Sequence, residues 1–79
     1  MQPTVGRVVL YHPFPTQARS SGLPPHLDNM LSHAALVTFV HPEDGWVELV
    51  VFPPRGLQYT VSASREGRDD GEWSWPPRA

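Results

Sequence analysis

Two apolar runs separated by a short polar break constrain this chain more than any other feature. The runs lie within Ala34–Phe52 (AALVTFVHPEDGWVELVVF), and the break between them is His41–Gly45. An Asp-Gly pair between two runs rich in β-branched residues is a strong hairpin signal, because glycine adopts the positive φ angles that tight hairpin turns require. The sequence therefore predicts a two-stranded antiparallel unit, the central hairpin 34–52.

Neither run alternates between apolar and polar residues, as a half-buried antiparallel strand does. The odd positions are expected to share one face: Ala35, Val37 and Phe39 in the first run, and Val47, Leu49 and Val51 in the second. The opposite face is also largely apolar, so both faces require cover. One face is expected to form the domain core, and the other to contact the long loop, the tail or a second subunit. The residues predicted at an oligomer interface are Trp46, Val50 and Phe52.

The length of 79 residues predicts a single domain, 1–79, near the size at which one core is marginally stable. Chains of this size usually gain stability from disulfides, a metal or a partner subunit. The chain has no cysteine, and its four histidines lack the paired spacing of a zinc site. Self-association is therefore the predicted source of additional stability.

The segments around the hairpin predict three further strands, at Thr4–Tyr11, Leu57–Ser62 and Glu72–Trp75, the last within a tail strand, 72–77. Residues 12–33 are rich in proline and form a long irregular loop, in which 25–32 is expected to form one or two helical turns with Leu27, Met30 and Leu31 facing inward. The predicted fold is mainly β: a small five-stranded SH3-like barrel or bent antiparallel sheet, with an OB-like barrel as the alternative.

Charge and composition exclude several classes of protein. The net charge of −2, without any lysine, lacks the basic surface of a protein that binds long nucleic acid. No apolar run reaches the length of a membrane span. The N-terminal residues lack the basic and apolar segments of a signal peptide, which predicts an intracellular or virion-borne protein.

The sequence also lacks the motifs of an enzyme. There is no cysteine nucleophile, no G-x-S-x-G, no glycine-rich phosphate loop and no metal-binding motif. Asp44 precedes a glycine in the hairpin turn, where aspartate serves backbone geometry, and Asp69 and Asp70 lie in a charged, solvated loop. We therefore expect a protein without catalytic residues, metal or cofactor.

Aromatic residues and arginines are the candidates for binding. Trp73 and Trp75 lie two residues apart and so face the same side of a strand. One interpretation is that they clamp the core or a subunit contact; the other is that they stack on a flat ligand, with Arg65, Arg68 or Arg78 near its phosphates and Tyr11, His12 and Phe14 opposite. Arg7 is either a hydrated edge residue or paired to a carboxylate or phosphate. The predicted ligand-binding residues are Trp73, Trp75, Tyr11, His12, Arg7 and Arg65.

Four motifs occur in a fixed order: V-G-R-V-V-x-Y, A-A-L-V-T-x-V, V-x-L-V-V-F and, at the end, G-E-W-S-W-P. Their pattern resembles short phage and prophage proteins of actinobacterial and other GC-rich hosts, over most of the chain outside residues 12–33. The last motif, with Gly71, Trp73, Trp75 and Pro76, is the most specific. The chain departs from the pattern at Leu10 and at Ser74, where those proteins have histidine. The resemblance implies a compact β domain in a viral setting, in the bacterial cytoplasm or in the virion.

Two functions are consistent with these features. The first is a non-enzymatic phage-type binding protein, a homo-oligomeric sponge that sequesters a nucleotide immune signal of the host, either a cyclic oligonucleotide or an NAD-derived ring. The second is a phage structural or assembly protein, or an adaptor that binds a host or virion protein through the apolar second face. The expected partners are further copies of the chain and a small nucleotide.

Overall fold

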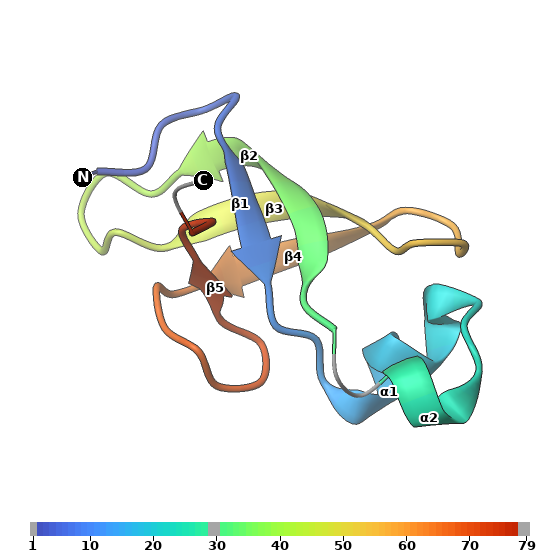
Figure 1. Cartoon of the computed structure of the whole chain (residues 1–79). Helices are drawn as coiled ribbons and strands as arrows, with labels where there is room; N and C mark the ends of the chain where they lie inside the picture. The colour runs from blue at the N-terminus through green and yellow to red at the C-terminus, as the bar shows by residue number, and fades with distance from the viewer. Residues whose placement is uncertain (1, 29–30, 78–79) are drawn as a thin grey trace.

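The computed structural model describes residues 2–28 and 31–77 of the chain. Its strands are β1 (Val8–Tyr11), β2 (His33–Val40), β3 (Val47–Phe52), β4 (Tyr59–Ser64) and β5 (Trp73–Ser74). They form one antiparallel sheet in the order β4-β3-β2-β1-β5, so that the last strand lies beside the first (Figure 1). The predicted mainly-β fold with five strands in a bent antiparallel sheet is confirmed.

The sheet curls back on itself through the segment that follows β4. The amide of Trp73 donates to the carbonyl of Arg65 (3.0 Å), and the amide of Gly67 donates to the carbonyl of Trp73 (2.7 Å). These bonds connect β5 to the end of the opposite edge strand, in addition to its pairing with β1. The result is a strongly curled half-barrel with one concave face.

The concave face holds the core. Its buried members are Val9, Tyr11, Ala35, Val37, Val47, Leu49, Val51 and Trp73. The alternation predicted for β3 is correct, because Val47, Leu49 and Val51 point inward and the residues between them point outward. Burial of these apolar side chains is the main favourable contribution to the free energy of folding.

The central hairpin forms as predicted, apart from one residue. The amide of His41 donates to the carbonyl of Trp46 (2.8 Å), and Gly45 has the positive φ of 72° that the turn requires. The pairing shifts register between Val37 and Phe39, so Thr38 is an additional residue in β2. This β-bulge turns Phe39 outward and brings Val40 against the core, which corrects the prediction that Phe39 shares the face of Val37.

The first and last strands are shorter than predicted. β1 begins at Val8 because Gly6 adopts a φ of 92° in a turn in which the Arg7 amide donates to the Thr4 carbonyl (3.1 Å). β4 begins two positions later than the predicted strand, at Tyr59, and β5 consists only of Trp73 and Ser74. The order of elements is unaffected by these differences.

The long segment between β1 and β2 contains three short helices, α1 (Pro15–Ala18), the 3₁₀ helix η1 (Arg19–Ser21) and α2 (Pro25–Asp28). They cluster beside one end of the sheet (Figure 1). The helical turn expected from Pro25 is therefore present, but Leu27 and Leu31 are exposed rather than inward, and Met30 lies outside the described residues. Within the described part of the chain, no helix has the length and apolar character needed to cross a membrane.

Candidate functional site

Two of the predicted ligand-binding residues belong to the core. Trp73 is 1% exposed and Tyr11 is 0% exposed. The Tyr11 hydroxyl donates a hydrogen bond to Gln17 Oε1 (2.8 Å), and burial raises the pKa of this phenol. Neither ring is accessible to a ligand in this structure. The burial of Trp73 agrees with the interpretation in which this tryptophan clamps the core.

The second tail tryptophan lies at the margin of the core with an arginine beside it. Trp75 is half-buried and packs edge-to-face on Trp73, with ring centroids 5.2 Å apart. The guanidinium carbon of Arg7 lies 5.8 Å from the centroid of the Trp75 ring, which is within cation–π range. The structure thus brings together Arg7, Trp75 and Trp73, all of which were predicted to be ligand-binding residues.

A closer arginine–tryptophan pair joins one predicted ligand-binding residue to one predicted interface residue. The guanidinium carbon of Arg65, just after β4, lies 4.1 Å from the centroid of Trp46, just before β3. No carboxylate of the described residues lies within ion-pair distance of Arg65, and contact with the Trp46 ring restricts the orientation of its planar donor group. Beside this pair lies a recess of about 270 Å³, lined by His41, Asp44, Trp46 and Ala63.

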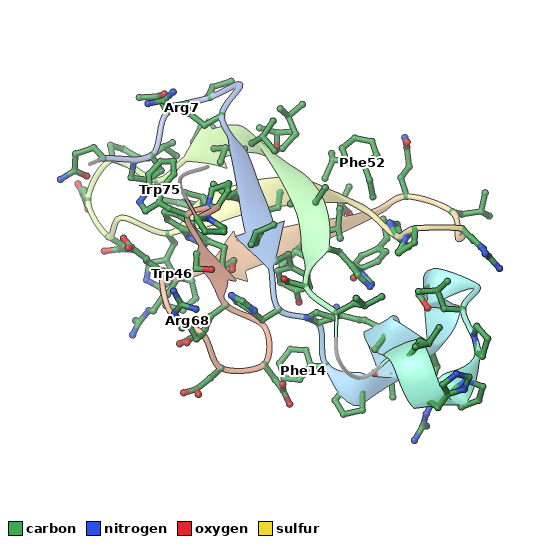
Figure 2. The ribbon with its side chains drawn as sticks, viewed as in Figure 1. Arg7, Phe14, Trp46, Phe52, Arg68 and Trp75 are labelled. Atoms are coloured by element: carbon green, nitrogen blue, oxygen red, sulfur yellow. The ribbon has the colours of Figure 1, made fainter. Side chains whose placement is uncertain are left out.

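Figure 2 shows that both exposed-side tryptophans and two of the arginines lie on the same side of this view. Arg7, Trp75, Trp46 and Arg68 lie toward the left of the view, away from Phe14 and Phe52. Arg68 is close enough to His12 to affect its protonation. Arg78, which was also expected near a ligand, lies outside the described residues. This side of the domain is called the arginine–tryptophan end below, and is defined by Arg7, Trp46, Arg65 and Trp75.

His12 forms a polar contact with Ser74, the last residue of β5. Its Nε2 lies 2.8 Å from the hydroxyl oxygen of Ser74, and this contact connects the end of β1 to the tail. Burial lowers the pKa of His12, and the nearby positive charge of Arg68 lowers it further, whereas Glu72 opposes both effects. A neutral imidazole paired with a nearly buried serine fixes the position of β5.

The predicted interface residues divide between two places. Val50 and Phe52 lie on the convex outer face of the sheet, where Phe52 is 42% exposed. Apolar side chains of the neighbouring strands β2 and β1 continue this face. We call it the outer apolar face; it comprises Val8, Leu10, Ala34, Leu36, Val50 and Phe52. Trp46 is at the other end of β3, with Glu48 between it and Val50.

A second concavity was not predicted. A groove of about 560 Å³ separates the α1–η1 segment from the beginning of β4, and is lined by Thr16, Gln17, Ser20, Leu57, Gln58 and Tyr59. The length of the irregular segment 12–33 was the only signal that could have indicated it, because such loops are usually functional. Behind the groove, the Tyr59 hydroxyl lies 3.5 Å from Nδ1 of the buried His33, and burial raises the pKa of Tyr59 to about 12.

Among the described residues, no group of histidine and acidic side chains could hold a metal ion. Comparison with protein-family models, with curated proteins and with solved structures finds no match to this chain. The resemblance to phage proteins therefore stays a prediction, and the function has to be inferred from the sites themselves.

Proposed function

We propose that this protein is a non-enzymatic binding protein, and that its ligand is a flat anion of the nucleotide class held at the arginine–tryptophan end. The stacking of Arg65 on Trp46 supports this proposal most directly. A planar arginine oriented by an aromatic ring donates two parallel hydrogen bonds to a phosphate, and an aromatic surface beside it accepts a base by stacking. The ligand class includes the cyclic oligonucleotides and NAD-derived rings that signal infection in bacteria.

The size of the recess supports a site shared between subunits. Sites that enclose a small molecule are usually about 300 to 1,000 Å³. The recess beside Trp46 has about 270 Å³, so one chain encloses only part of a nucleotide. A second copy that contacts the outward side of β3 would provide the remaining wall. The proposed binding protein is therefore a homo-oligomer.

Calorimetry of the assembled protein against cyclic dinucleotides, cyclic trinucleotides and ADP-ribose isomers tests this function. An Arg65→Gln variant is expected to bind about ten-fold or more weakly, because a charge-assisted hydrogen bond contributes about 1.5 to 3 kcal/mol. The matched control is Arg19→Gln, which removes the same charge from an exposed arginine of η1 and should leave the affinity unchanged. Absence of heat with every nucleotide, for a protein shown to be oligomeric, would refute the proposal.

The outer apolar face favours a second candidate function, in which the protein is a phage structural or assembly protein, or an adaptor for a host protein. Exposed, contiguous apolar surface on a small domain marks a protein contact, and three adjacent strands contribute to this face. Copurification with virions, or a stable heterocomplex in host lysate that a Phe52→Asp substitution abolishes, would favour this function over nucleotide binding.

A further inference from the structure

The groove at the opposite end of β3 from Trp46 has one wall made by Leu57, Gln58 and Tyr59, the last of which begins the edge strand β4. β4 pairs only with β3, and its backbone makes no other backbone hydrogen bond within the described part of the chain. The strand YTVSAS contains no charge and no proline, which are the residues that usually protect an edge from pairing with another chain. Leu57, just before the strand, is 90% exposed at the mouth of the groove.

The opposite wall presents an amide donor in a fixed orientation. Gln17 Oε1 accepts two hydrogen bonds, from the Tyr11 hydroxyl (2.8 Å) and from the backbone amide of Phe14 (2.9 Å). These bonds determine which side of the carboxamide is oxygen and which is nitrogen. Neither donor of the Gln17 side-chain nitrogen is used by a described residue, and Gln17 lines the groove. The buried Tyr11 thus holds a hydrogen-bond donor opposite the edge strand.

The β3–β4 turn lies close to the η1 segment. The amide of Arg55 donates to the carbonyl of Ser21 (2.9 Å), which connects the turn to η1. The Ser20 carbonyl lies so close to Gly56 that a Cβ atom there would collide with it, so only glycine permits this approach. These contacts hold the η1 segment against the β3–β4 turn, beside Ser20 and Leu57 of the groove lining.

We propose that this groove binds an extended, uncharged peptide segment of a partner protein, which pairs with β4 as an additional strand. The edge of β4 supplies main-chain hydrogen bonds, the Gln17 amide donates to a peptide carbonyl from the other wall, and Leu57 contacts an apolar side chain of the peptide. Strand addition gains affinity from main-chain bonds and specificity from such side-chain contacts. No charged residue lines the groove, so the bound segment is uncharged. The register shift between β3 and β4 limits the regular edge to Tyr59–Val61, so the bound segment is three or four residues long.

The test uses the ¹⁵N-labelled full chain and a blocked peptide, Ac-TLTVT-NH2, titrated to millimolar concentration by NMR. Because main-chain bonds provide the affinity, a generic strand-forming peptide is a sufficient probe. We expect saturable shifts of the Leu57–Tyr59 amides and of the Gln17 side-chain amide. The same peptide methylated at every internal nitrogen keeps its side chains but loses its donors, and should bind about ten-fold or more weakly.

A Gln17→Glu variant makes the test specific, because it keeps both accepted hydrogen bonds and replaces the amide donor with oxygen. We expect about ten-fold weaker peptide binding by this variant, while Gln2→Glu, the same change at an exposed position outside the groove, binds like the native chain. Equal binding of the methylated peptide would overturn the proposal, as would no shift with the peptide. Shifts with maltotriose instead would assign the groove to a neutral sugar. Since no nucleotide is involved, these outcomes are independent of the proposed function at the arginine–tryptophan end.

Discussion

Leu49 and Val50 are adjacent in β3 and point to opposite faces, so the same substitution at each separates folding from assembly. Leu49 is 1% exposed within the core, whereas Val50 is half-buried on the outer apolar face, between Leu36 and Thr60 of the neighbouring strands. A domain of 79 residues is expected to have a free energy of unfolding of about 4 to 12 kcal/mol. Truncating a buried leucine costs about 2 to 5 kcal/mol of this stability.

Replacing Leu49 by Asp adds the penalty of placing a carboxyl group without a partner in the core, which is several kcal/mol more. The total cost approaches the stability of the domain, so Leu49→Asp should be unfolded in buffer. Replacing Val50 by Asp leaves the carboxylate in contact with water and removes only part of a valine contact, which costs about 1 kcal/mol. This variant should fold, but it should weaken the proposed homo-oligomer.

Urea unfolding followed by tryptophan fluorescence measures the stability of each variant, and light scattering measures its mass over a range of protein concentrations. A native-like transition for Leu49→Asp would show that the concave face is not the core. If Val50→Asp changed neither mass nor stability, the inference that both faces of the hairpin are covered would be wrong.

Three further predictions concern protonation and backbone strain. Burial lowers the pKa of His33 below its ordinary value of 6.5, so protonation of His33 opposes folding. As pH decreases from 6.5 through the lowered pKa, His33 should reduce the stability by up to about 1.4 kcal/mol per pH unit. In urea unfolding, His33→Gln should make this pH dependence shallower and leave the contribution of His12, whereas His26→Gln, at an exposed histidine, should leave it unchanged. Burial raises the pKa of Tyr59 from 10.0 to about 12, so its protonated form stabilises the fold below pH 10, and stability should decline between pH 10 and 12. Absorbance titration should show phenolates that form above pH 10, and Tyr59→Phe should reduce this absorbance to that of Tyr11 alone. Gly71 has a φ of 85°, and a Cβ atom at this position would collide with the Phe14 ring, whereas Gly45 has a φ of 72° in open space. Gly71→Ala should therefore be destabilised more than Gly45→Ala, and equal urea midpoints would contradict the close approach of Phe14.

Local patterns predicted the hairpin because its signals act over short distances. The Asp-Gly turn, the β-branched runs and the alternation along β3 each depend on neighbouring residues, and the structure agrees with them. The bulge at Thr38 could not be predicted in this way, because a register shift depends on how two strands fit their other neighbours. Phe39 was therefore assigned to the wrong face although the strand itself was correct.

The candidate sites were harder to predict because they depend on contacts between distant segments. Trp73 and Trp75 were predicted to share one side of a strand, but β5 ends at Ser74, before Trp75. Only the curl of the sheet determines that Trp73 is buried and that Trp75 packs at the margin of the core. The pairing of Arg65 with Trp46 requires the β3–β4 ladder, and no local pattern indicates it. The groove depends on helices of three or four residues, which are too short for periodicity to reveal.

The positions of Trp46 and Val50 connect binding to assembly. Trp46 immediately precedes β3 and Val50 lies within it. Both are at outward positions, and only Glu48 lies between them on that side of the strand. A second copy that covers Val50 would therefore lie close to the recess beside Trp46, which is too small to enclose a nucleotide alone. A ligand that contacts both copies binds the assembled state more tightly than it binds a single chain. It therefore stabilises the assembled state by mass action. The proposed nucleotide should therefore increase the oligomer fraction of Val50→Ala, a variant weakened in assembly, and a ligand bound within one chain should leave that fraction unchanged.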